Sequence, residues 1–558
     1  MTPSAPVRCA GLLAPLFALR RDGDLGIGDT KALRGLLHWA AQHEVGFVQL
    51  LPINEMGPDN SPYNAISSVA LDPIFLEISA EKIPELTEGE VATVRESLSV
   101  ESLDGPLVDY PTVRRAKRGL LEKAYERFRD PVRVAAFERF WEEEAGWLED
   151  YAVFRTLIDV HGHECWDRWP EGARGSVEAR DPRVQFHAWV QWLAFSQWRA
   201  LREEGLKLGV RLMGDIPIGV SFYSADVFAK PELFDLEWCG GAPPEQVFKD
   251  DPFVVKWGQN WGIPLYRWDV MERGDFAWWR QRIDKLTDVF DIFRIDHVLG
   301  FYRIYGFPWR PQYNAEFLPL SEQEAAERTG GRLPHYIEHA DDTPEHCAAN
   351  LAAGDKYLRA VQAAAGGAEV VAEDLGSVPD YVRPHLLERG IPGFKVPQWE
   401  VDGSDHAIPG AEYAECSFAT YATHDHPPLR AIWETNRHNM TDHPEHDERM
   451  KAGRELRLIA EFCGMPPQDH YPPYSPEVQG WLLRGLLTSS SRYAALMITD
   501  LFGMEDRFNR PGVVDGANWR TRLPFTVEDL STLPELMGPV CELQTLIRQT
   551  NRSAVQRG

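Results

Sequence analysis

Four acidic residues stand where short apolar segments give way to polar sequence: Asp215 in GDIPIGV, Asp296 in RIDHVLG, Glu373 in AEDLG and Asp425 in THDH. Two carboxyl groups that flank an acetal carbon can cleave its bond to oxygen, because one protonates the leaving oxygen while the other attacks or stabilises the positive centre. A third can bind the hydroxyl groups of a sugar. Arg294 precedes Asp296 by two residues, so Asp296 can equally be half of a structural ion pair. The acetal hypothesis therefore requires these carboxyl groups to meet at one place.

The elements that would bring them together are eight short apolar runs, each of which ends in a polar or charged residue. Stretches with helical periodicity, such as TKALRGLLHWAAQ, separate most of these runs. Continuous apolar strands that alternate with helices are typical of a parallel sheet covered on both faces. Eight such units predict an α/β fold of the (β/α)8 TIM barrel class. The predicted strands are 9–19, 46–53, 210–218, 290–297, 368–375, 393–399, 416–425 and 495–503.

Long insertions interrupt the predicted barrel. Residues 84–180 indicate a mainly helical, charged insertion subdomain between the second and third strands. Residues 222–272 and 302–345 indicate loop insertions rich in proline, glycine and aromatic residues. Insertions that follow strands lie at the carboxyl-terminal mouth of such a barrel, where active sites are built. We expect residues 1–558 to form a single catalytic barrel domain.

The charge of the chain restricts its partners. With 58 basic and 85 acidic residues, the formal net charge is −27. Such a surface repels phosphate backbones and anionic lipids, so we expect no nucleic-acid and no membrane partner. The seven cysteines are scattered without a CxxC pair, and the N-terminus does not fit a signal peptide, so a cytoplasmic protein is expected.

The 19 tryptophans are either core residues or stacking surfaces for sugar rings.

Several motifs occur in an order and spacing that resembles a known family. They are SPYNA (61–65), GDIPI (214–218), GQNWGIPLYRW (258–268), RIDHVLGF (294–301), AEDLG (372–376), GIPGFKV (390–396), ATHD (422–425) and NRPGV with NW (509–513, 518–519). The set is similar to the 4-α-glucanotransferases called amylomaltases or disproportionating enzymes, glycoside hydrolase family 77, from about residue 10 to about residue 525.

The resemblance implies a barrel enzyme that transfers a segment of a (1→4)-α-D-glucan to the 4-hydroxyl of another glucan or of glucose. The implied mechanism is a retaining double displacement through a covalent glucosyl-enzyme. The implied substrates are maltooligosaccharides and other α-1,4-glucans, and the resemblance implies no metal and no cofactor.

It also implies roles for individual residues. Asp296 matches the nucleophile, Glu373 the general acid/base and Asp425 the stabiliser of the transition state. Arg294 would keep Asp296 ionised by charge and hydrogen bonding. The other substrate-binding residues would be Tyr63, stacked beside the cleaved sugar; Trp261, on the acceptor side; Asp215 and His424, which contact sugar hydroxyls or hold that shell in place; and Asn509, on the wall near the last strand.

Two features depart from the family pattern. His426 follows Asp425 where many relatives would carry Asn, and the loop 245–257 is longer than usual. We expect the apolar residues of this loop to alter acceptor preference or to contact a partner; they are Phe253, Val254, Val255 and Trp257.

Two other functions stay open at this point. An α-glucan hydrolase of the α-amylase type would use the same intermediate and let water attack it, and a non-catalytic glucan-binding protein would use the same barrel without the chemistry. The combination of Asp296, Glu373 and Asp425 favours an enzyme, since a binding protein has no need of all three. The sequence does not set the preferred donor length or the oligomeric state.

Overall fold

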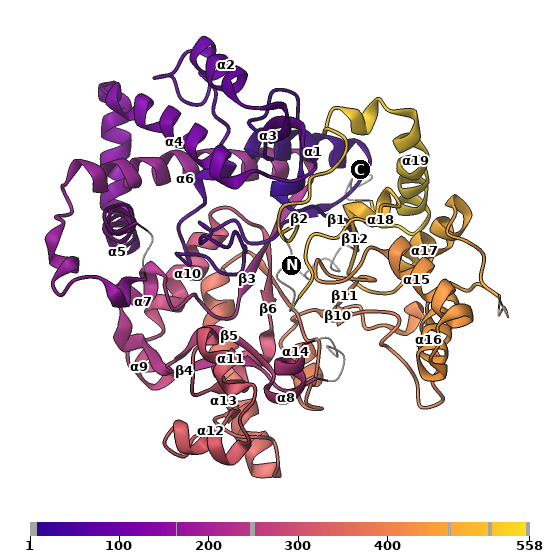
Figure 1. Ribbon diagram of the computed structural model, residues 1–558. Coiled ribbons are helices and arrows are strands. Elements are labelled where there is room, and N and C mark those ends of the chain that lie inside the picture. Colours follow the sequence, from indigo (N-terminus) through magenta and orange to yellow (C-terminus); the bar gives the residue numbers. More distant parts are fainter. Residues whose placement is uncertain are drawn as a thin grey trace, which may run out of the picture.

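Eight parallel strands form a closed barrel at the centre of the molecule (Figure 1). The computed structural model describes residues 8–162, 165–245, 251–466, 468, 470–511 and 516–553. Around the barrel the strands follow the order β1-β12-β11-β10-β9-β6-β3-β2, which confirms the predicted fold class. Their bounds are β1 Cys9–Leu13, β2 Phe47–Gln49, β3 Arg211–Pro217, β6 Ile292–Asp296, β9 Glu369–Ala372, β10 Gly393–Lys395, β11 Ser417–Ala419 and β12 Tyr493–Met497.

All eight barrel strands lie in or overlap the predicted apolar runs, but the runs extend beyond the ends of the strands. The run 495–503 is the clearest case, because β12 ends at Met497 and helix α18 (Ile498–Leu501) follows. The buried carboxylate of Asp500 ends the strand there, since it accepts hydrogen bonds from the backbone N–H groups of Met497 (3.3 Å) and Leu429 (2.6 Å). Buried apolar residues therefore continue past the strand into a helical turn.

Large side chains fill the barrel interior, and small ones make room for them. Phe47, Met213, Ile292, Val371, Phe394, Phe418 and Tyr493 pack there in one buried cluster. A side chain on Gly11 would come within 2.1 Å of the Phe47 ring, so glycine at this position allows the ring to cross the interior. The interior is thus a packed core that supports the mouth, not a channel.

Helices surround the barrel, and several begin with a polar cap followed by proline. Asp181, Thr343 and Ser475 each accept a hydrogen bond from a first-turn N–H and precede a proline at the first helical position. This pairing satisfies a free donor and sets the backbone for a helix. The helices around the barrel are α1 Thr30–Gln42, α6 Pro182–Leu208, α10 Ala277–Thr287, α13 Pro344–Ala365, α14 Val382–Glu388, α15 Leu429–Asp442, α16 His446–Phe462, α17 Pro476–Thr488 and α19 Pro534–Gln549.

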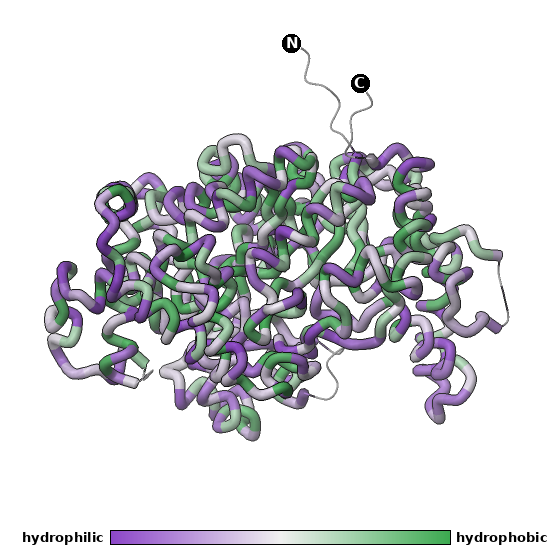
Figure 2. Tube along the Cα trace, turned by 90° about the horizontal axis from the view of Figure 1, so that it is seen from above, coloured by the Kyte–Doolittle hydropathy of each residue, from purple (hydrophilic) through white to green (hydrophobic). Residues whose placement is uncertain are grey.

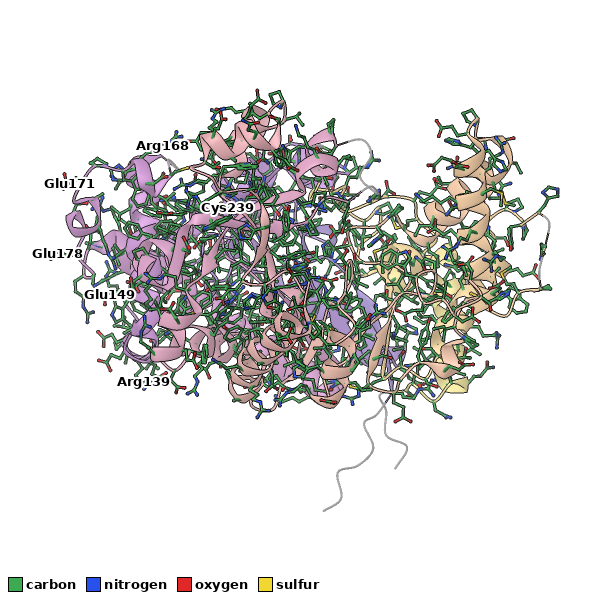
Figure 3. All side chains as sticks on the ribbon, turned by 90° about the horizontal axis from the view of Figure 1, so that it is seen from below. Arg139, Glu149, Arg168, Glu171, Glu178 and Cys239 are labelled. Carbon is green, nitrogen blue, oxygen red and sulfur yellow. The ribbon has the colours of Figure 1, made fainter. Side chains whose placement is uncertain are left out.

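Between β2 and β3 the chain forms four further helices, at the upper left of Figure 1: α2 Glu88–Ser97, α3 Val100–Asp104, α4 Tyr110–Glu126 and α5 Pro131–His161. Of these, α4 and α5 pack with α6, whose Trp189 and Trp198 are buried core residues and not sugar-stacking surfaces. Charged side chains such as Arg139, Glu149 and Glu178 point away from the body at the outer edge (Figure 3). Hydrophobic segments lie mainly inside the molecule and hydrophilic ones mainly along its projecting parts (Figure 2). None of the described helices is long and apolar enough to cross a membrane.

The segments 222–272 and 302–345 contain an antiparallel sheet that the loop prediction did not include. Its strand order is β5-β4-β7-β8, with bounds β4 Phe234–Ala242, β5 Gln259–Tyr266, β7 Ile304–Phe307 and β8 His335–Ile337. Short helices accompany it: α7 Ala225–Ala229, α8 Pro252–Trp257, α9 Trp268–Arg273, α11 Asn314–Phe317 and α12 Glu322–Arg328.

Burial contradicts the predicted partner contact for three of the four apolar residues of the loop 245–257, whereas their effect on acceptor preference stays a prediction. Residues 246–250 lie outside the described part of the chain, but Phe253, Val254 and Trp257 in α8 are buried. Phe253 and Trp257 pack with the aromatic rings of Phe307 and Trp309. These side chains are the core of the antiparallel sheet, so they are not free to contact an acceptor or a partner.

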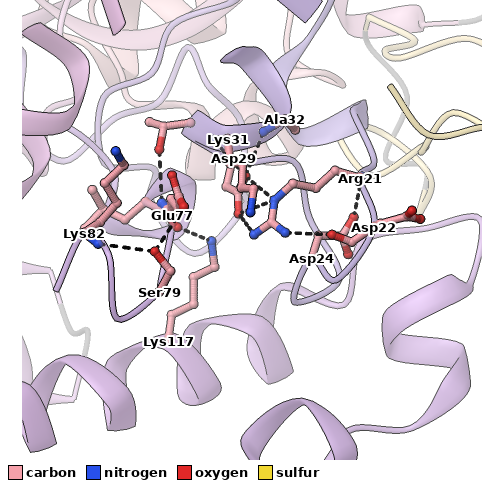
Figure 4. A network of polar contacts seen from close by, with 12 residues as sticks. Arg21, Asp22, Asp24, Asp29, Lys31, Ala32, Glu77, Ser79, Lys82 and Lys117 are labelled. Carbon is pink, nitrogen blue, oxygen red and sulfur yellow. Dashed lines mark hydrogen bonds and ion pairs between the residues drawn. The ribbon is translucent and has the colours of Figure 1, made fainter. Parts of the chain in front are cut away.

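A buried ion network ties the segment after β1 to α1 (Figure 4). The Arg21 guanidinium donates to both oxygens of Asp29, at 2.9 Å to Oδ1 and 2.7 Å to Oδ2. Asp29 Oδ1 also accepts from the N–H groups of Lys31 and Ala32, which caps α1. Nearby, Lys117 of α4 donates to the carbonyl oxygens of Ile74 and Leu76, and burial lowers the pKa of Lys117 to about 8.

Removal of one member of this buried pair should destabilise the protein strongly. Asp29→Ala leaves the Arg21 charge buried without its partner and uncaps α1, so we expect the free energy of unfolding to fall by about 3–5 kcal/mol. Urea unfolding followed by tryptophan fluorescence measures it. The matched control is Asp104→Ala, which breaks the more exposed Arg20–Asp104 pair and should cost less than about 1 kcal/mol. Equal losses in the two variants would contradict the prediction.

Candidate active site

The four acidic residues lie at one end of the barrel, on or after the strands β3, β6, β9 and β11. Asp296 is the last residue of β6, and Glu373 comes directly after β9. Asp425 lies on the segment that follows β11. Asp215 lies two residues before the end of β3, so the expectation that it ends the strand is wrong; it faces Arg294 across the β3–β6 pair. This is the carboxyl-terminal mouth, where (β/α)8 enzymes carry out their chemistry.

The guanidinium of Arg294 joins three of these carboxyl groups. Its Nη1 donates to Asp215 Oδ2 at 2.6 Å, while Nη2 lies 2.7 Å from Asp296 Oδ1 and 3.8 Å from Glu373 Oε2. Burial alone would lower the pKa of Arg294, but the charges of Asp215 and Asp296 raise it well above the usual arginine value. Arg294 is therefore a permanent positive charge at the floor of the site.

Glu373 lies in a setting that favours its protonated form. Burial and the nearby charge of Asp296 raise its pKa to about 8, although Arg294 lowers it. Two backbone N–H groups orient the carboxyl group: that of His297 donates to Oε2 at 2.7 Å, and that of Leu375 donates to Oε1 at 2.9 Å. A carboxyl group that keeps its proton near neutral pH can serve as a general acid.

Asp425 has the opposite electrostatic setting. Burial raises its pKa, but the His424 imidazole and a hydrogen bond from Asn509 outweigh burial and hold the pKa below the usual aspartate value. Asn509 Nδ2 donates to Asp425 Oδ1 at 2.6 Å, and His424 Nε2 lies 3.3 Å from the same oxygen. The side chain remains 39% exposed, so the ionised carboxylate can still reach a ligand.

Tyr63 connects the two sides of this site. Its hydroxyl donates to Asp215 Oδ2 at 2.7 Å, and its ring stacks on the His424 imidazole with centroids 4.9 Å apart. The hydroxyl also lies 3.3 Å from His424 Nδ1. Trp519 packs against both rings, at 5.7 Å from each. The predicted residues Tyr63, Asp215 and His424 thus form one contiguous wall with Arg294.

Trp261 lies on the opposite side, on β5 of the antiparallel sheet. Its ring meets the His297 ring edge to face, with centroids 4.8 Å apart, and 37% of the residue is exposed. His297 directly follows Asp296, so the contact places Trp261 next to the carboxyl group predicted to react. All nine predicted site residues therefore belong to one connected set of contacts.

The structure adds contacts that the motifs did not predict. Arg507 donates to the backbone carbonyl of Asp425 at 2.6 Å and so fixes the turn that carries it. The N–H of His297 reaches Glu373 because His297 adopts a left-handed backbone conformation, with φ of 51°. Nδ1 of His426 bonds the Thr423 hydroxyl at 2.9 Å, and its ring packs against Trp399. The only sequence signal for Arg507 is its position two residues before Asn509, the first residue of the NRPG motif.

Comparison with known proteins gives a consistent result. Residues 14–527 match the family described as 4-alpha-glucanotransferase, glycoside hydrolase family 77. The chain is 31% identical to the 4-alpha-glucanotransferase of Thermus thermophilus over 540 residues, which covers 92% of this chain and 95% of the relative. It is 29% identical to the 4-alpha-glucanotransferase of Chlamydia caviae, with 94% and 92% covered.

Solved structures support the same fold. The amylomaltase of Corynebacterium glutamicum matches with a TM-score of 0.76 at 22% identity, covering 96% of this chain and 75% of that one. The amylomaltase of Streptococcus agalactiae in complex with acarbose matches with a TM-score of 0.72 at 23% identity, covering 98% and 100%. With a family match over most of its length and a relative above 30% identity, the chain belongs to the 4-α-glucanotransferases of glycoside hydrolase family 77.

Proposed function

We propose that this protein is a 4-α-glucanotransferase that transfers a segment of a (1→4)-α-D-glucan to the 4-hydroxyl of a second glucan or of glucose. The observation that carries the proposal is the pair Asp296 and Glu373, which share the Arg294 guanidinium. Family membership supplies the substrate class, maltooligosaccharides and other α-1,4-glucans.

In the first step of the proposed reaction, the Asp296 carboxylate attacks the anomeric carbon of the donor. The bond from this carbon to the glycosidic oxygen breaks, and Glu373 gives its proton to that oxygen. In the second step, the Glu373 carboxylate takes the proton from the acceptor 4-hydroxyl, whose oxygen attacks the anomeric carbon and displaces Asp296. Both steps invert the carbon, so the α-configuration is retained.

The shared contact with Arg294 keeps the two reacting carboxyl groups near each other, as a retaining mechanism requires. Asp296 Oδ1 and Glu373 Oε2 both contact Arg294 Nη2, at 2.7 and 3.8 Å, so these two oxygens are at most 6.5 Å apart. Retaining enzymes hold their carboxyl groups about 5–5.5 Å apart, whereas inverting enzymes need about 6.5–9.5 Å to admit a water molecule. The contacts of Asp425 support a role as the charge that stabilises the oxocarbenium-like transition state.

The choice between transfer and hydrolysis depends on the acceptor side. A transferase must favour a sugar hydroxyl over water, which requires a positioned acceptor and a site from which water is displaced. Trp261 beside His297 offers an aromatic surface for an acceptor ring at this point.

We also propose that the helical segment 84–180 and the insertions 222–272 and 302–345 work as parts of one catalytic domain. The protein is proposed to be cytoplasmic, because its cysteines are scattered and free.

The products formed from maltotriose test the proposed activity. A transferase should yield glucose together with a ladder of longer maltooligosaccharides, whereas a hydrolase would yield only shorter sugars. Asp296→Asn should lower the rate by at least about 10⁴-fold, since the nucleophile is lost. Chromatography of the products at early times measures both results. Products no longer than maltotriose, or an active Asp296→Asn variant, would refute the proposal.

The pH dependence tests the role of Glu373. The pKa near 8 means that its proton is present below about pH 8 and is lost above it, so kcat/KM should fall about tenfold per pH unit on the alkaline side. Glu373→Gln should lower the rate on maltotriose by about 10²–10⁴-fold. Maltosyl fluoride has a leaving group that needs no proton, so it should still form the glycosyl-enzyme in this variant. Equal losses on both donors would contradict the assignment of Glu373 as the acid.

A further inference from the structure

Trp261 lies where strand β5 departs from regular pairing. Within the described part of the chain, β5 is an edge strand of the antiparallel sheet and pairs with β4 on one side only. Asn260 and Ile263 lie opposite two consecutive residues of β4, so Trp261 and Gly262 between them form a bulge. A bulge redirects a side chain and leaves its residues without a partner in the ladder. The direction of the Trp261 ring therefore depends on contacts outside the sheet.

The turn 309–314, which follows β7, holds the bulge from both sides. Asn260, which precedes the bulge, donates through Nδ2 to the carbonyl oxygen of Trp309 at 2.9 Å. Gly262, inside the bulge, has a left-handed conformation with φ of 73°, and a side chain there would come within 2.8 Å of the Pro311 ring. Glycine at this position thus lets Pro311 pack directly on the bulge. The position of the bulge, and of the aromatic ring that it carries, follows the position of this turn.

Arg310 anchors the turn to two other segments of the chain. Its Nη1 donates to Oδ2 of Asp167, in the helical insertion, at 2.6 Å. Its guanidinium carbon lies 3.7 Å from the centroid of the Phe222 ring, in the segment after β3. Phe222 is buried and stacks on Trp166 with centroids 5.4 Å apart, so the ring under the guanidinium is itself held in place. One side chain therefore joins the turn to the helical insertion and to the barrel.

The contacts of Arg310 suit a role in placing the turn more than a role in stabilising the fold. The side chains of Arg310 and Asp167 are 28% and 27% exposed, and ion pairs near the surface contribute little to stability. A planar guanidinium that stacks on a ring while it bonds a carboxylate has few orientations open to it. Because a misplacement of about 1 Å can lower a rate by about 100-fold, a small shift of the bulge is enough to affect a reacting sugar.

We propose that Arg310 is a positioning residue for the acceptor. Together with Asp167 it keeps the Trp261 ring at the His297 ring, and so determines how often a sugar rather than water takes the glycosyl unit. The proposal rests on the proposed function, because the acceptor role of Trp261 belongs to it. Loss of Arg310 should leave the formation of the glycosyl-enzyme intact and weaken the capture of the acceptor.

The fate of the glycosyl-enzyme tests this role. The full-length protein receives maltosyl fluoride as donor and glucose as acceptor, so that water yields maltose and glucose yields maltotriose. In Arg310→Ala and in Asp167→Asn we expect the KM for glucose to rise at least about tenfold. The first release of fluoride, which reports formation of the glycosyl-enzyme, should change by less than about twofold. An unchanged KM for glucose in both variants would overturn the proposal.

Arg332→Ala is the matched control on the same sheet. Arg332 also bonds a carboxylate, that of Glu237 at 2.8 Å, and its guanidinium also lies over an aromatic ring, that of Trp238. Both partners lie on β4 and not on the turn that holds the bulge. This variant should keep the wild-type KM for glucose, and a rise equal to that of Arg310→Ala would contradict the positioning role.

Fluorine NMR of the full-length protein labelled with 5-fluorotryptophan tests the position of Trp261 without any substrate. The Trp261 resonance is assigned with the variant Trp261→Phe. We expect this resonance to shift in Arg310→Ala and in Asp167→Asn and to stay in place in Arg332→Ala. A resonance that stays fixed in the first two variants would refute the positioning of Trp261. Shifts of the resonance in a protein that makes no maltotriose would uphold the positioning and refute the proposed function, so the two proposals fail separately.

Discussion

The charge of the Arg294 guanidinium is the interaction on which the candidate site depends. Asp215 is nearly fully buried, and an unpaired carboxylate in that position would cost several kcal/mol. Arg294 compensates it and at the same time lies within reach of Asp296 and Glu373. Burial raises the pKa of Glu373 to about 8, and with one cation for three carboxyl groups the charge of Arg294 does not offset it.

The helices of the 84–180 segment and α6 support this site from behind. The loop that carries Tyr63 begins and ends at residues held by them: Arg155 of α5 bonds Glu55 at 2.8 Å, and Arg114 of α4 bonds Asp72 at 3.2 Å. Gln191 of α6 both accepts from and donates to the backbone of Leu71, at 2.9 Å each. These side chains of α4, α5 and α6 therefore help to hold the loop that places the Tyr63 ring over His424.

The sequence predicted the barrel well, because each of its strands is an apolar run bounded by polar residues, and it indicated the four carboxyl groups because each lies within or at the end of such a run. It did not predict the antiparallel sheet. β4 contains Gly240 and Gly241, and its pairing with β5 shifts register twice, so neither strand shows regular alternation. The apolar residues of α8 were misread for a related reason: their packing partners Phe307 and Trp309 come from a distant segment.

Within the candidate site, the contacts that could not be predicted from the sequence are those made by backbone groups. The pairing of Arg294 with Asp296 is local in sequence and was predicted. The N–H of His297 donates to Glu373 only because His297 adopts a left-handed backbone conformation, which its residue type does not predict. Likewise, Arg507 donates a hydrogen bond to the backbone carbonyl of Asp425, and a contact to a carbonyl oxygen does not depend on the type of the accepting residue, so no sequence motif predicts it.

The closure of the barrel has a consequence for how the protein forms during synthesis. Cys9 of β1 pairs with Tyr493 of β12, so the two strands that complete the ring come from nearly opposite ends of the chain. Until β12 has left the ribosome, β1 has an unpaired edge, and such edges invite aggregation. The mouth itself needs only residues up to Asp425 and the Asn509 segment. The ribosome therefore delivers the last barrel strand and the last site residue almost together, and a nascent chain gains its stable barrel and its complete site in the same short interval.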